Sequence, residues 1–289
     1  MTRREVLIGS AYAALSNTAL ADAQPSAVRF GVRTPLPPHT GLRERAKLVR
    51  SLGYDGIELG PEWLNEPIAD LQETLDGSGV VVSAIVGSLG LLDTDAAKRT
   101  QAVELDRKRL EMARALGAGF VIEVPVFGPN RFEQLGVPNA RQFEETLLVA
   151  GLRQLSSAVR DTGVTLLLEP CNHKETHFMT KQSQAAATIK AVGAPGFKIL
   201  SDFYHMQIEE INIAETLSRY GRDTGYVHLA DGAARTEPGS LPFDYRPGFH
   251  ALKKAGFHGW LTVESKASDT PERSLARALK YVKQQWADA

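Results

Sequence analysis

Short runs rich in branched aliphatic residues alternate with longer amphipathic runs along most of the chain. The short runs predict eight strands, at residues 27–34, 54–60, 80–87, 119–126, 164–170, 197–203, 225–231 and 259–265. Amphipathic segments between them predict helices, and most end on a Gly, as a helix C-cap does. The clearest helical segments lie at 42–53, 97–117, 144–163 and 184–193, and a last one at 271–286 follows the eighth strand.

This alternation predicts an α/β fold, a single-domain (β/α)8 barrel over residues 28–286. Strands that are almost continuously apolar and are joined by helices form parallel sheets buried on both faces. An open, doubly wound sheet is the alternative, and it would be expected to carry a Gly-rich phosphate turn. Neither GxGxxG nor GxxxxGK[ST] occurs here. The longest irregular segments, 126–138 and 232–248, follow the fourth and seventh strands, where a barrel carries active-site loops.

The first 23 residues are typical of a bacterial export signal. Arg3 and Arg4 precede an uncharged stretch from Val6 to Ala21, and small residues suited to cleavage follow. The paired arginines resemble a twin-arginine signal, which exports proteins already folded. We therefore expect the periplasm or the exterior as location, or the cytoplasm if the leader is not functional. No run of 18 apolar residues predicts a membrane anchor.

Charge and cysteine content narrow the classes of function. The 289 residues include 33 Lys plus Arg and 34 Asp plus Glu, a formal net charge of -1. Without a basic cluster the chain lacks the signature of a nucleic-acid binder, so a small-molecule substrate is expected. The one cysteine, Cys171, has no partner for a disulfide within the chain. A homo-oligomer is compatible with these features.

Polar side chains stand at or near the ends of the last four predicted strands. In chain order they are Glu169, Asp202, His205, His228 and Glu264. Such strand ends meet at one mouth of a barrel, and a charge buried there needs a partner. For any one of them a hydrogen-bonded structural role is the alternative. The three carboxylates together with one of the two imidazoles suit a divalent ion such as Mn²⁺, Mg²⁺ or Co²⁺, and suit zinc less well.

Two further acids, Glu58 and Glu123, lie in or near the second and fourth predicted strands. Each allows two interpretations, since its side chain either faces the pocket or pairs with an Arg or Lys of the surrounding helices. The sequence leaves this choice open.

The segments LEPCNHKE, SDFYH, VHLAD and VES, which contain these acids and histidines, resemble the xylose-isomerase-like barrel superfamily. The resemblance is to the sugar isomerase and epimerase branch that includes D-tagatose 3-epimerase and hydroxypyruvate isomerase. It covers residues 28–286 and is most specific in the C-terminal half. In the N-terminal half it rests on strand order and on GIEL at 56–59.

The resemblance implies roles for individual residues. One divalent metal ion would be bound by Glu169, Asp202, His228 and Glu264, and the two glutamates would also act as catalytic acid and base. Three more residues would contact the substrate: His205, Glu175 and Arg235. His173 stands where the family often has an Arg, which is a departure at the substrate end of the pocket.

The chemistry that fits this set is proton transfer at a carbon next to a carbonyl. A metal ion stabilises the cis-enediolate that forms when the proton leaves, and two carboxylates can remove and return the proton. The outcome is epimerisation or isomerisation of a sugar. Two alternatives remain open: a lyase or dehydratase acting on inososes or 3-keto-glycosides, and a non-catalytic sugar-binding barrel. An endonuclease IV-like phosphodiesterase is disfavoured, because strands three and four end without histidines.

Overall fold

The computed structural model describes residues 28–289, which form a closed barrel of eight parallel strands. Hydrogen-bonded neighbours follow chain order, and β8 pairs back onto β1. The strands are β1 (Arg29–Thr34), β2 (Gly56–Leu59), β3 (Val81–Val86), β4 (Phe120–Glu123), β5 (Thr165–Leu168), β6 (Phe197–Asp202), β7 (Thr224–Leu229) and β8 (Trp260–Glu264). The predicted barrel and its eight strands are confirmed. The predicted export signal lies outside the described residues.

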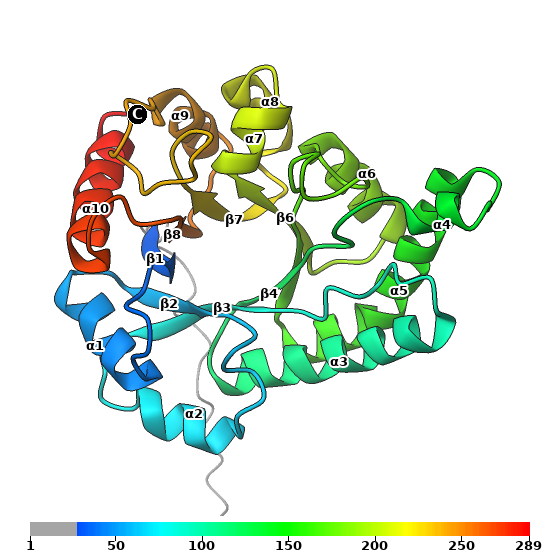
Figure 1. Ribbon diagram of the computed structural model, residues 1–289, viewed down its shortest axis with the longest axis horizontal. Helices are drawn as coiled ribbons and strands as arrows, with labels where there is room; N and C mark the ends of the chain where they lie inside the picture. Colours follow the sequence, from blue (N-terminus) through cyan, green and yellow to red (C-terminus); the bar gives the residue numbers. More distant parts are fainter. Residues whose placement is uncertain (1–27) are drawn as a thin grey trace, which may run out of the picture.

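Helices surround the strands as an outer ring (Figure 1). They are α1 (Leu42–Ser51), α2 (Ile68–Leu75), α3 (Ala96–Ala115), α4 (Arg131–Gln134), α5 (Ala140–Thr162), α6 (Gln182–Val192), α7 (Phe203–Glu209), α8 (Ile213–Tyr220), α9 (Arg246–Lys254) and α10 (Pro271–Ala287). The five clearest helical segments of the sequence are confirmed as α1, α3, α5, α6 and α10. The sequence did not predict α2, α4, α7 and α8, because eight or fewer residues establish little 3.6-residue periodicity.

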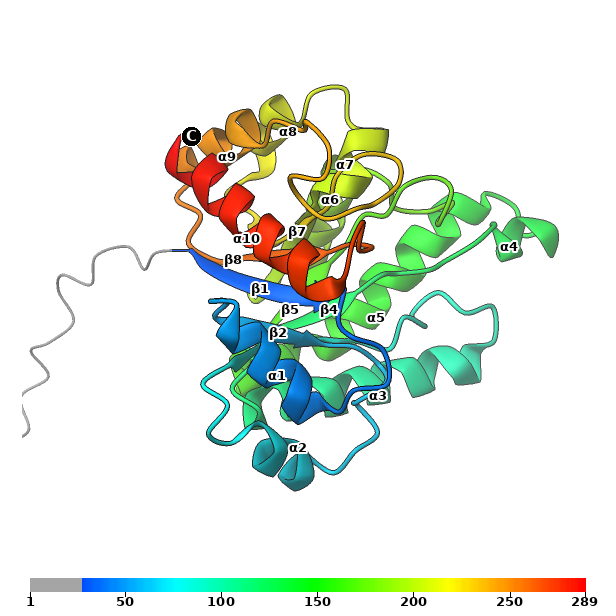
Figure 2. The same cartoon turned by 60° about the vertical axis from the view of Figure 1, so that its left-hand side comes forward.

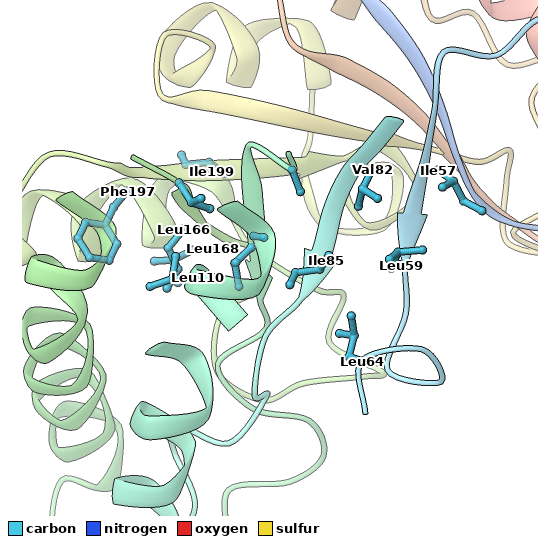
Figure 3. Close-up of a cluster of buried hydrophobic side chains, with 14 of the residues drawn as sticks. Ile57, Leu59, Leu64, Val82, Ile85, Leu110, Leu166, Leu168, Phe197 and Ile199 are labelled. Carbon is cyan, nitrogen blue, oxygen red and sulfur yellow. The ribbon is translucent and has the colours of Figure 1, made fainter. Parts of the chain in front are cut away.

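Alternating strand residues separate an inner core from an outer one. Within β5, Leu167 packs inside the barrel, whereas Leu166 and Leu168 pack outward against the helices. The inner layer consists of Ala84, Ile122, Leu167, Leu200, Tyr226 and Trp260. Figure 3 shows part of the outer core, in which side chains of β2, β3, β5 and β6 lie together with Leu110 of α3. The barrel interior is therefore filled.

Gly56 shows how closely the inner layer is packed. A side chain at this position would place its Cβ 2.5 Å from the ring of Trp260 on β8. Only Gly leaves room for the indole, which is 1% exposed and fills the barrel beside β2.

Two long loops lie beyond the C-terminal ends of the strands. The first includes α4 and joins β4 to α5, and the second joins β7 to α9 (Figure 2). Parallel strands place both loops at the same end of the barrel, as the sequence predicted. Within residues 28–289, no helix combines the length and apolar character needed to cross a bilayer.

Candidate active site

The strand alternation that builds the inner core also directs four polar side chains into the barrel mouth. Each lies an even number of residues beyond an inner-core residue and so faces the same way. The pairs are Leu167 and Glu169, Leu200 and Asp202, Tyr226 and His228, and Trp260 and Glu264. The inner core thus forms the floor beneath a ring of acids and a histidine.

Strand register then brings these side chains together. Asp202 is the direct partner of His228 in the pairing of β6 with β7, so the two lie side by side. One ligand atom from each of Glu169, Asp202, His228 and Glu264 lies within 4.8 Å of every other. The carboxylate of Glu264 is partly exposed and the other three residues are buried. The structure therefore gathers the four residues that the sequence singled out as metal ligands.

Only one of the two ring nitrogens of His228 has a hydrogen-bond partner. Its Nε2 lies 2.8 Å from Oε2 of Glu58, a carboxylate from β2. Its Nδ1 faces the cluster, 3.2 Å from Glu264 and 3.6 Å from Glu169, and is a buried nitrogen without a hydrogen-bond partner. Burial alone would lower the pKa of His228, but Glu58 and Glu264 outweigh burial and raise it well above its usual value.

The pKa values of Glu169 and Glu264 are shifted in opposite directions. Burial raises the pKa of Glu169, although His228 opposes this. Burial would also raise the pKa of Glu264, but the positive charges of His228 and Arg235 outweigh it and hold that pKa well below the usual range. Carboxyls whose environments separate their pKa values are suited to opposite roles in proton transfer.

His205 lies beside the cluster, and the protein determines which of its nitrogens faces inward. The backbone N–H of Asn172 donates to Nδ1 of His205 at 3.1 Å, so Nδ1 accepts. In the neutral ring the proton therefore resides on Nε2. Nε2 lies 3.4 Å from Asp202 and 3.8 Å from Glu169. His205 can donate a hydrogen bond to an oxygen bound at the cluster.

Arg235 and Glu175, the other two residues matched to substrate contacts, lie at the rim. A guanidinium nitrogen of Arg235 donates to Glu264 and lies 3.3 Å from Asp202. A second guanidinium nitrogen lies 3.9 Å from Glu175, and the group stacks 4.6 Å above the ring of Tyr204. Arg235 has φ of 54°, a left-handed conformation that is uncommon outside Gly. The loop after β7 thus places the guanidinium of Arg235 over the carboxylates of Asp202 and Glu264.

Two residues of this site received no role from the sequence. Asn172 orients His205 and also donates through Nδ2 to Glu175 at 3.0 Å. Tyr204 stacks on the guanidinium of Arg235. The segment LEPCNHKE contains Asn172 and could have indicated it. Nothing in the sequence distinguishes Tyr204 from a core aromatic.

A second group of potential ligands consists of Glu169, Cys171 and His205. Burial and the nearby carboxylates raise the pKa of the Cys171 thiol well above its usual value. Metals bind the thiolate form, which this environment disfavours. The oxygen-rich group of four is therefore the better candidate metal centre.

Three other residues weighed from the sequence have defined positions. Glu58 faces the interior and pairs with His228, and also lies 3.6 Å from Arg33. Glu123 follows the inner residue Ile122 and so faces the helices, as one interpretation held. That interpretation was wrong about its partners, which are the backbone of Leu89 and the hydroxyl of Ser88 instead of an Arg or Lys. His173 is exposed and binds Glu209 on α7.

A different hollow, of about 540 Å³, opens at the N-terminal end of the barrel. Its lining includes Arg29, Lys198, Arg222 and His258 but no Asp or Glu. Lys198 and His258 contact backbone carbonyl oxygens there. The carboxylates of the candidate site therefore lie at the opposite end of the barrel, at the mouth described above.

Comparison with known proteins finds sugar epimerases and an isomerase among the relatives of this chain. The chain is 24% identical over 245 residues to 3-dehydro-D-guloside 4-epimerase of Escherichia coli, covering 83% of this chain and 93% of that one. It is 28% identical over 248 residues to L-ribulose 3-epimerase of Mesorhizobium japonicum, covering 83% and 80%. The relatives also include hydroxypyruvate isomerase of Escherichia coli, 32% identical over 130 residues, 44% of this chain and 50% of that enzyme.

Solved structures share the architecture. The fold superposes on 3-keto-D-glucoside 4-epimerase from E. coli with a TM-score of 0.78 at 22% identity, covering 90% of this chain and 99% of that one. D-allulose 3-epimerase from Methylomonas sp. gives 0.77 at 23% identity, with 90% and 98% covered. The family described as Xylose isomerase-like TIM barrel matches residues 46–285. The protein with this ring of three carboxylates and one histidine therefore belongs to the xylose isomerase-like TIM barrel family.

Proposed function

We propose that the protein is a divalent-metal-dependent sugar epimerase or isomerase, with Glu169 and Glu264 as acid and base. The observation that carries the proposal is the group of Glu169, Asp202, His228 and Glu264, with ligand atoms within 4.8 Å of one another. The names of the relatives, which include two sugar epimerases and an isomerase, support the same class of reaction.

The donor set fits a divalent ion. Nδ1 of His228 is a buried nitrogen that lacks a hydrogen-bond partner and faces two carboxylates. Three carboxylates and one neutral imidazole form the mixed oxygen and nitrogen set that Mn²⁺, Mg²⁺ and Co²⁺ accept. Bound there, the ion would stabilise negative charge on adjacent carbonyl and hydroxyl oxygens of a sugar.

The positions of the two glutamates suit transfer of a proton at a carbon held between them. Glu169 follows β5 and Glu264 ends β8, so the two carboxylates approach the mouth from strands three places apart in the ring. Glu264, with the lowered pKa, is the ionised carboxylate and would take the proton, and Glu169, with the raised pKa, holds a proton more readily and would return one. Return to the opposite face gives an epimer, and return to the neighbouring carbon gives an isomer.

The remaining polar groups orient the sugar. Nε2–H of His205 is directed toward the cluster by Asn172 and would donate to a substrate oxygen. Arg235 and Glu175, at the rim, would bind hydroxyl groups further along the substrate. Each of these groups is already positioned by a partner, which reduces the entropy lost when substrate binds.

A keto-glycoside lyase is the second candidate, because the same base and cation could expel a β-substituent after the proton has left. The epimerase acting on 3-dehydro-D-guloside, which matches over most of its length, favours a keto-glycoside as substrate in either case. A sugar-binding barrel without activity is disfavoured, since binding alone has no need for two carboxyls with separated pKa values.

The test is metal analysis of the purified protein, followed by incubation in D2O with free ketoses and 3-keto-glycosides. Deuterium incorporated at a carbon next to the carbonyl, dependent on Mn²⁺, Mg²⁺ or Co²⁺, is the expected result. NMR of the products then separates epimer, isomer and elimination product. Absence of exchange from every substrate in the metal-loaded protein would contradict the proposal.

A further inference from the structure

We propose that Glu58 is a positioning residue that holds His228 in the tautomer with its proton on Nε2, so that the Nδ1 lone pair faces the metal centre. The inference deepens the proposed function and rests on it for the identity of the cluster. It assigns a role to a strand, β2, that supplies none of the four ligands.

The two ring nitrogens of His228 have different partners, and these partners determine which nitrogen carries the proton. Nε2 of His228 lies 2.8 Å from Oε2 of Glu58, and both side chains are 2% exposed. A carboxylate only accepts, so Nε2 must carry the proton. Nδ1 is then free of its proton in the neutral ring and has its lone pair directed between Glu169 and Glu264. Only this form of the imidazole can bind a cation with Nδ1.

Glu58 is itself oriented by Arg33 of β1. Nε of Arg33 lies 3.6 Å from Oε1 of Glu58, while Oε2 of Glu58 is engaged with His228. This ion pair favours the orientation in which Oε1 faces Arg33 and Oε2 faces His228. The chain of contacts thus runs from β1 through β2 to β7, between residues as far as 170 positions apart.

A purely packing role for Glu58 would not need a carboxylate. Gly56 and Glu58 are the inward positions of β2, and Gly56 already accommodates Trp260. An apolar residue at 58 would fill the same space without the cost of burying a charge. The hydrogen bond to His228 and the ion pair with Arg33 account for the acid.

Glu58→Leu and Glu58→Gln separate shape, hydrogen bonding and charge. Leu removes the acceptor, whereas the Gln amide oxygen still accepts from Nε2–H but carries no charge. Glu62→Gln is the matched control, because Glu62 also lies near Arg33, at 3.4 Å, but pairs with no histidine. Far-UV circular dichroism and Tm establish that each variant folds. If Glu58→Leu does not fold, Glu58→Ala, which also lacks the acceptor, takes its place in both measurements.

The first readout is ¹⁵N NMR of the histidine rings in metal-free protein, at a pH above the raised pKa of His228 so that its ring is neutral. The variant His228→Gln identifies the signals of residue 228. Wild type, Glu58→Gln and Glu62→Gln should show the proton on Nε2, and Glu58→Leu a mixture of tautomers. The second readout is the Kd for Mn²⁺ by calorimetry, with Co²⁺ absorption as a check on the ligand set. We expect the Kd to rise about 10- to 100-fold in Glu58→Leu, less in Glu58→Gln, and to stay unchanged in Glu62→Gln.

The outcomes distinguish this inference from the proposed function. An unchanged tautomer and an unchanged Kd in Glu58→Leu would overturn the positioning role while leaving the metal-dependent reaction intact. Failure of the wild type to bind Mn²⁺, Mg²⁺ or Co²⁺ would contradict the proposed metal centre, and the NMR measurement would still decide whether Glu58 sets the tautomer.

Discussion

The backbone N–H of Asn172 donates a 3.1 Å hydrogen bond to Nδ1 of His205, and this contact turns Nε2–H of the ring toward the cluster of acids. A main-chain donor fixed by the loop after β5 thus determines the tautomer of a side chain on α7. The same principle governs His228, where the side chain of Glu58 plays the corresponding part from β2.

His205→Ala should weaken substrate binding without loss of the metal. The variant lacks the Nε2–H donor, and a hydrogen bond to an oxygen that gains negative charge contributes about 1.5–3 kcal/mol. We expect kcat/KM to fall about 10- to 100-fold and bound Mn²⁺ to stay at the wild-type level. His258→Ala, which removes an exposed histidine at the opposite end of the barrel, is the control. A His205→Ala enzyme with unchanged kcat/KM would remove His205 from the site.

Glu169→Gln and Glu264→Gln should affect chemistry more than metal content. Gln keeps an oxygen that can bind a cation but does not accept a proton at neutral pH. Loss of either group should lower kcat about 10²- to 10⁴-fold. In an epimerase, each variant retains deuterium exchange from one face while net conversion collapses. In a lyase, only the variant that lacks the abstracting base loses exchange. Full turnover by either variant would refute the acid or base role of that glutamate.

Arg235→Lys should bind substrate about as weakly as Arg235→Ala. Arg235 contacts Glu264 and Asp202 and stacks on Tyr204, whereas an ammonium group offers neither a planar fork nor a stacking face. We expect KM to rise in both variants, measured by initial rates over a range of substrate concentrations. Arg246→Ala tests the specificity of the effect, since Arg246 pairs with the exposed Asp244 at the start of α9. A wild-type KM in Arg235→Lys would show that only the positive charge at this position matters.

Glu123→Gln should change how stability depends on pH. Burial raises the pKa of Asp106 to about 6 and that of Glu123 well above its usual value, with the charge of Asp106 adding to the effect on Glu123. The folded state therefore binds more protons than the unfolded one above pH ~4, and the stability contributed by the protonated pair is lost as pH rises through about 6. Gln keeps the acceptor for the amide of Leu89 without this penalty.

The measurement is Tm of Glu123→Gln minus Tm of wild type, at pH values from 5 to 8. This difference should become more positive as pH rises. Glu133→Gln, on the short helix α4, is a comparison without a buried acid pair. A difference in Tm that stays constant over the range would show that Glu123 does not carry the raised pKa.

Arg3→Lys with Arg4→Lys should block export if residues 1–23 act as a twin-arginine signal. The wild-type chain expressed in a bacterium with this pathway is expected in the periplasmic fraction, and the double variant in the cytoplasm. Immunoblots of fractionated cells measure the distribution, and a host that lacks the exporter provides the control. Equal export of both chains would assign residues 1–23 another role.

The sequence alone determined the barrel and most of its site. Each of the strands β5 to β8 is a short apolar run with an acid or a histidine at its last residue or one residue to either side of it. Parallel strands necessarily bring such ends to one mouth. That logic needs no knowledge of packing, which explains why Glu169, Asp202, His228 and Glu264 could be grouped before any coordinates were known.

The tertiary structure decided which side of a strand faces inward and which distant groups meet. All four residues of β2 are buried, so hydrophobicity did not reveal whether Glu58 points to the barrel or to the helices. Glu123 posed the same problem and took the opposite face, against Ser88 and Leu89. The contact of Glu58 with His228 depends on barrel closure and on strand register. These are properties of the whole sheet, and no local stretch of sequence encodes them.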